Sequence, residues 1–154
     1  MRLSESHSLP VPLVDAWGAL NDLAVLQHAL PGCKSLLQIA ANEFVGEIAI
    51  PLGPVTSNVT IHVHRRDIDA PRGCTLYFES RSLAGGGTGS AAMHLTPEAD
   101  AATTLRVDVE VEIGGIVAQL SAPLIDLAAH QMAALFFQRF RQGAIARQSG
   151  AAIP

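Results

Sequence analysis

Apolar and polar residues alternate through much of the chain, and this pattern predicts a protein rich in β-strands. The clearest case is residues 103–113, where every second residue from Leu105 to Ile113 is apolar. A period of two is typical of an antiparallel strand with one buried face and one solvent-facing side. Shorter strand signals occur at residues 2–9, 44–50, 55–64 and 75–81, and around Met93 and Leu95.

Prolines and glycines divide these strands from one another. Residues 51–54 and 69–73 combine proline and glycine, and we expect a turn at each of them. The glycine-rich residues 85–89 predict the connection of a hairpin. A phosphate-binding loop is a poorer interpretation of them, because no helix and no P-loop lysine follow.

Helical spacing occurs at two places in the chain. Pro12 is positioned to begin a short helix, and Asn21 or Asp22 can cap a second one that ends at Pro31. After Gly114 the period becomes helical again, and a long helix is expected over residues 116–147. Pro123 either kinks this helix or marks the start of its regular part. Strands segregated from helices favour an α+β fold, with one domain over residues 1–148 and a flexible tail over 149–154.

Composition and charge narrow the function. The chain has 154 residues, 49% of them hydrophobic, and a net charge of −4 without any run of Lys and Arg. This balance argues against a nucleic-acid partner. The two cysteines have no metal-ligand spacing, and the segment His62–His64 offers only two imidazoles, so we expect no metal and no cofactor. No signal peptide or transmembrane segment is recognisable, and we expect a cytoplasmic location with free thiols.

Several short motifs resemble those of the CoxG family of carbon monoxide dehydrogenase subunits. The segment PLVDAWGALND at residues 12–22 leads to LPGC at 30–33, and GEIAIPLGPV at 46–55 is similar to another family segment. The last predicted strand, the GGIVAQL that follows it, and Phe136-Phe137 complete a similarity over about residues 1–145. The resemblance implies the START-like (SRPBCC) helix-grip fold: a curved antiparallel sheet of about seven strands around a long C-terminal helix, with two short helices after the first strand.

The resemblance also implies a function. It implies a non-enzymatic protein that binds a hydrophobic, lipid-like or quinone-like ligand and serves a molybdenum hydroxylase of the carbon monoxide dehydrogenase type as an accessory or docking protein. Contact with a membrane surface and homodimer formation stay open. The expected ligand-binding residues lie on the inner faces of the strands and the long helix: Leu26, Leu30, Phe44, Ile48, Ser57, Val59, Ile61, Phe78, Ser80, Met93, Val107, Leu120, Leu124 and Leu127.

Two other functions remain open at the level of the sequence. An enzyme of the polyketide cyclase/dehydratase type requires a His, Asp, Glu or Arg that points into the cavity. The acidic residues of 103–113 alternate outward, so we expect no acid/base pair inside. A protein interaction module with a filled core would instead expose apolar residues of the long helix, such as Ile125, Met132 and Phe137.

Overall fold

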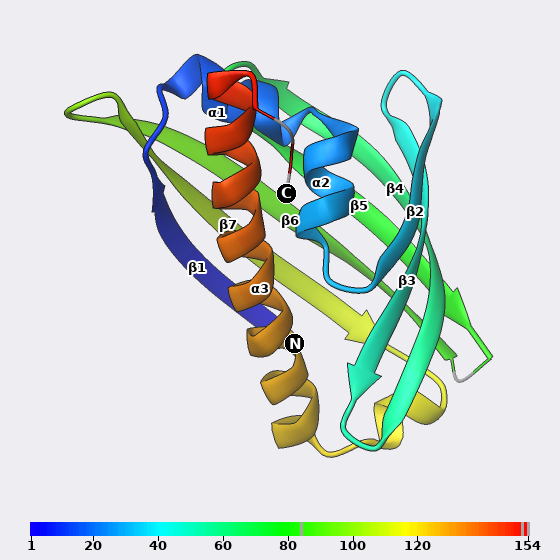
Figure 1. Cartoon of the computed structure of the whole chain (residues 1–154). Coiled ribbons are helices and arrows are strands. Elements are labelled where there is room, and N and C mark those ends of the chain that lie inside the picture. Colours follow the sequence, from blue (N-terminus) through cyan, green and yellow to red (C-terminus); the bar gives the residue numbers. More distant parts are fainter. Residues whose placement is uncertain (84, 152, 154) are drawn as a thin grey trace.

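The computed structural model describes residues 1–83, 85–151 and 153, and its strands form a single antiparallel sheet in the order β1-β7-β6-β5-β4-β3-β2. Figure 1 shows the sheet behind the long helix α3, with the short helices α1 and α2 beside the C-terminal half of α3. The elements are β1 (Arg2–Leu9), α1 (Leu13–Leu20), α2 (Leu23–Ala29), β2 (Cys33–Ala40), β3 (Glu43–Leu52), β4 (Val55–Asp69), β5 (Gly73–Ser82), β6 (Gly85–Glu98), β7 (Ala102–Ile113), a 3₁₀ turn η1 (Ile116–Gln119) and α3 (Ala122–Ser149).

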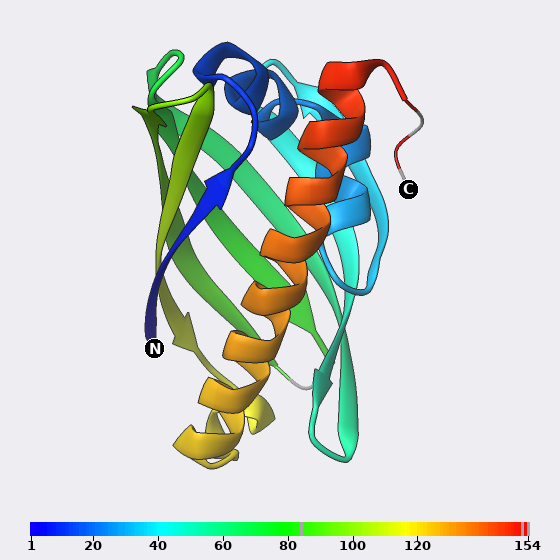
Figure 2. The same cartoon turned by 60° about the vertical axis from the view of Figure 1, so that its left-hand side comes forward.

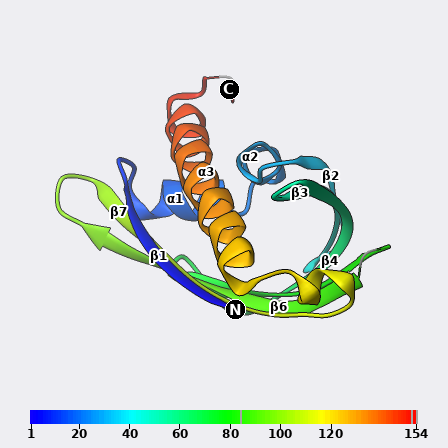
Figure 3. The same ribbon diagram turned by 90° about the horizontal axis from the view of Figure 1, so that it is seen from below.

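The sheet curves around α3, which confirms the fold that the alternating pattern and the resemblance predict. Figure 3 shows α3 within the concave side of the sheet, and Figure 2 shows it crossing the strands obliquely. The predicted alternation places the inward side chains: Val63 of β4 pairs with Phe78 of β5, and Met93 of β6 pairs with Val107 of β7. All four of these residues face the helix and line the space beneath it.

The long helix begins later than the sequence predicts. Residues 116–119 form the 3₁₀ turn, and α3 starts at Ala122 with Pro123 in its first turn. The Ser121 hydroxyl caps this end by accepting a hydrogen bond from the Leu124 N–H at 3.3 Å. Proline fits the first turn of a helix because no intrahelical acceptor is available there for the missing N–H. Of the two roles considered for Pro123, the structure therefore shows the start of the regular helix.

The glycine-rich segment is part of a strand, and the expectation of a hairpin connection at residues 85–89 is wrong. Gly85 pairs with Ser82 and Gly89 pairs with Phe78, so the glycines form the first residues of β6. The physical reason is space on the inner face. A Cβ at Gly89 would lie 2.9 Å from Cζ of Phe78, so a larger residue there would displace the ring.

The core is concentrated at one end of the molecule, where α1, α2 and the C-terminal half of α3 cover the sheet. Its largest fully buried side chains include Phe140, Leu9, Leu105 and Val25. The C-terminal residue Ile153 packs against this core, in the segment expected to be a flexible tail. Residues 152 and 154 of that segment lie outside the described residues.

A buried hydrogen bond joins β7 to the segment before α1. Thr103 is fully buried, and its Oγ1 donates to the Val11 carbonyl oxygen at 2.8 Å. The substitution Thr103→Val keeps the shape but leaves this carbonyl without its donor, so we expect the free energy of unfolding to fall by about 1–3 kcal/mol. Urea denaturation measures this loss. Thr104→Val, which removes an exposed hydroxyl, is the control, and equal losses in the two variants would contradict the account.

Candidate functional site

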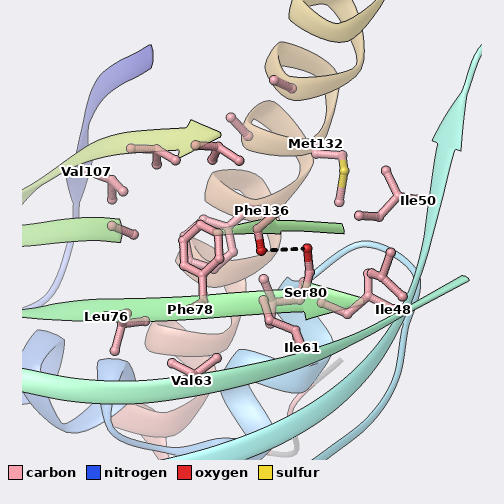
Figure 4. Close-up of a pocket in the computed structure, with 18 of the residues that line it drawn as sticks. Ile48, Ile50, Ile61, Val63, Leu76, Phe78, Ser80, Val107, Met132 and Phe136 are labelled. Carbon is pink, nitrogen blue, oxygen red and sulfur yellow. Dashed lines mark hydrogen bonds between the residues drawn. The ribbon is translucent and has the colours of Figure 1, made fainter. Parts of the chain in front are cut away.

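A cavity of about 460 Å³ lies between the concave face of the sheet and the N-terminal half of α3. Figure 4 shows its wall, with Ile48, Phe78 and Val107 on the strands and Met132 and Phe136 on α3. The lining is almost entirely aliphatic and aromatic, and its volume lies within the range of pockets that hold small molecules. The interaction module with a filled core is therefore wrong as a description of this fold.

The cavity exists because small residues face each other across it. The inner face of β6 presents Gly85, Gly87 and Ala91, while α3 presents Ala128, Ala129 and Ala133. Protein interiors otherwise pack nearly as densely as organic crystals. Larger side chains at these positions would close the space, as Phe140 and Leu105 do at the end that holds the core.

Most of the predicted ligand-binding residues line this cavity. Eleven of them do so: Leu26, Leu30, Phe44, Ile48, Ser57, Val59, Ile61, Phe78, Ser80, Met93 and Val107. Three lie outside the lining. Leu127 is 55% exposed on the outer side of α3, and Leu124 lies against Gly53 in the turn between β3 and β4. Leu120 precedes α3 and does not line the cavity either.

The helix presents a different face from the one expected. Ile125, Met132 and Phe137, considered above as an exposed surface, line the cavity instead, and Phe137 is only 5% exposed. Leu127 and Leu135 point outward. Apolar residues occupy several sides of α3, so their spacing alone did not show which side faces the sheet.

Three serines supply most of the polar atoms near one end of the cavity. The Ser80 hydroxyl donates to the Gly87 carbonyl at 3.3 Å, and Figure 4 shows Ser80 among apolar side chains. The Ser82 hydroxyl donates to the Gly85 carbonyl at 2.6 Å, and the Ser57 hydroxyl donates to Ser82 Oγ at 3.4 Å. Their hydrogens are therefore used within the protein, which leaves oxygen lone pairs to accept a hydrogen bond from a ligand.

Two charged residues line the cavity, and the sequence interpretation missed both. Arg65 continues the inward row of β4 by one step beyond Val63, and Glu5 follows Leu3 on β1. Glu5 Oε2 lies 3.2 Å from His7 Nε2, and the His7 ring stacks on Phe137 with a centroid distance of 4.1 Å. Extending the alternation of each strand by one step is the signal that finds them.

The cysteines and the histidine pair of β4 offer little further chemistry. Burial raises the pKa of the Cys33 and Cys74 thiols, so both favour the neutral form. His62 and His64 lie beside Glu43, which pairs with His64 across β3 and β4. Within residues 1–83, 85–151 and 153 there is no group of three His, Cys, Asp or Glu side chains arranged to hold a metal ion.

Comparisons with solved structures identify the fold. A conserved protein from Geobacillus kaustophilus is 23% identical, with 94% of this chain and 95% of that chain covered and a TM-score of 0.88. A START superfamily protein from Mycobacterium smegmatis is 11% identical over 89% and 92% of the two chains, with a TM-score of 0.70. The Zhui aromatase/cyclase from Streptomyces sp. R1128 is 12% identical over 99% of each chain, with a TM-score of 0.68.

The family is shown by the sequence itself. No curated protein matches the chain. Among the helices of the described residues, none combines the length and the apolar character needed to cross a membrane. The family model of the carbon monoxide dehydrogenase CoxG subunits matches residues 8–145, which is most of the chain. The protein thus belongs to the CoxG family and has the START-like helix-grip fold.

Proposed function

We propose that this protein binds a lipid-like or quinone-like molecule in the cavity beneath α3, without catalysing a reaction on it. The observation that carries this proposal is a volume of about 460 Å³ with an almost wholly apolar lining. Burial of apolar ligand surface contributes about 25 cal/mol per Å², so this wall favours a hydrophobic guest. The eleven lining residues predicted from the sequence are the proposed contacts, with Ser57 and Ser80 as polar anchors.

We further propose that the bound molecule serves a molybdenum hydroxylase of the carbon monoxide dehydrogenase type. Membership of the CoxG family supports this accessory or docking role. A cytoplasmic protein of this kind would exchange its ligand at a membrane surface. Exposed apolar residues in the turns of the sheet support that contact, namely Val55 at the start of β4 and Leu83 after β5.

A second candidate, an enzyme of the polyketide cyclase/dehydratase type, rests on one specific observation. Glu5 lines the cavity and contacts His7, so a carboxylate and an imidazole lie side by side at its edge. Such a pair is able to move a proton if a substrate comes within hydrogen-bonding distance. His7 is itself outside the cavity lining, and this makes ligand carriage the better-supported function.

Native mass spectrometry of gently purified protein tests ligand carriage. We expect a mass above that of the chain alone, which disappears after extraction with organic solvent. The extracted molecule should be hydrophobic and chemically unchanged after incubation with the protein. Loss of the proposal would follow from protein that is bare when isolated and that also takes up no lipid or quinone on addition. Conversion of the added molecule would favour the enzyme.

A further inference from the structure

One cation stands at the end of the inward row of β4. The row runs through Ser57, Val59, Ile61 and Val63 to Arg65, and all five side chains line the cavity. The guanidinium carbon of Arg65 lies 5.5 Å from the centroid of the Phe44 ring. We call this region, next to the junction of α1 and α2 and the turn between β2 and β3, the Arg65 end of the cavity.

The hydrogen-bond partners of Arg65 are all neutral. Its Nε donates to Asn42 Oδ1 at 3.2 Å, and its Nη2 donates to the same oxygen at 3.1 Å and to the Ala41 carbonyl at 3.3 Å. Its Nη1 donates to Asn21 Oδ1. A guanidinium has five N–H donors, so one N–H of Nη1 has no acceptor in the part of the chain that the structure describes.

Arg65 also lacks a carboxylate partner within the described residues, since the ion pairs found there involve Arg2, Arg106 and Arg147 or histidines. Its charge acts on the cavity wall. Burial raises the pKa of the Cys74 thiol, and the positive charge of Arg65 partly offsets that rise. A cation beside an apolar wall is costly unless an anion compensates it.

We propose that the Arg65 end of the cavity is a carboxylate-binding subsite, so that the ligand is an apolar chain or ring system that ends in a carboxylate. This inference rests on the proposed function and names the class of its ligand. Guanidinium and carboxylate form charge-assisted hydrogen bonds, which are about twice as strong as neutral ones. The apolar part of the ligand would then extend from Arg65 along β6 and α3 toward the three serines.

The test compares two ligands that differ only in their polar end. Calorimetric titration at mildly alkaline pH measures the dissociation constants of decanoate and of decanol. For the unmodified protein we expect decanoate to bind at least about tenfold more tightly, the ratio that one hydrogen bond to a charged group supplies. In Arg65→Gln this ratio should fall to about one. Arg66→Gln is the matched control, because it removes the same charge from the exposed neighbour and should leave the ratio unchanged.

The outcomes separate this inference from the proposed function. Equal binding of decanoate and decanol to the unmodified protein overturns the subsite but leaves ligand carriage intact, and that measurement needs no variant to fold. A structural role of Arg65 alone would weaken both ligands equally in Arg65→Gln, and this result also overturns the subsite. Failure of both ligands to bind the unmodified protein overturns the subsite together with the proposed function.

Discussion

The variant Ala133→Phe is expected to lose most of its affinity for an apolar ligand while it keeps its fold. Ala133 lies on the side of α3 that lines the cavity, opposite the glycine and alanine positions of β6. A phenyl ring there would occupy space that the ligand needs. Excluding about 100 Å² of ligand surface costs about 2.5 kcal/mol, which corresponds to a roughly 70-fold weaker dissociation constant. Calorimetric titration with decanol measures the change.

The neighbouring residue provides the control for this experiment. Ala134 is exposed on the other side of the same helical turn, so Ala134→Phe makes the same chemical change away from the cavity. Its dissociation constant should stay within about twofold of the unmodified protein. If Ala133→Phe bound decanol as tightly as Ala134→Phe does, the ligand would not occupy the space beneath α3.

The largest expected effect on stability comes from Phe140→Ala. Phe140 is fully buried at the end of the molecule that holds the core, and its ring stacks on Phe136 with a centroid distance of 5.6 Å. Truncation removes the ring and leaves a cavity among residues that α1, α2 and β7 hold in place. Changes of this kind cost about 3–5 kcal/mol of the free energy of unfolding. Denaturation by urea or guanidinium gives the value.

The same helix offers a comparison for this truncation. Leu135 is 40% exposed on the outer face of α3, so Leu135→Ala should cost less than about 1 kcal/mol. The account requires a clear difference between the two variants. Similar losses of stability would mean that α3 packs with a different face toward the sheet.

The strand pattern predicted the sheet because each strand has one wet and one covered face. The alternation of residues 103–113 appears directly in the pairing of β7 with β1 and β6, and extending it along β4 leads to Arg65. A strand admits only two orientations of its side chains, so a single clear run is enough to decide between them.

The helix and the glycines were harder to interpret because their roles depend on partners distant in the sequence. Leu127 and Phe137 are both apolar, and only the packing of α2 and the sheet against α3 decides that Phe137 is covered while Leu127 is not. Glycines 85–89 are typical of a turn by their own preferences. Their place in β6 follows from the ring of Phe78 on the adjacent strand, which needs the room that Gly89 leaves.

A crystal structure of gently purified protein, or of protein crystallised with decanoate, tests the central claim most directly. The account predicts continuous elongated density between β6 and the N-terminal half of α3, in contact with Phe78 and Met132. A cavity closed by rearranged side chains, or one that contains only separate water molecules under both conditions, would contradict it.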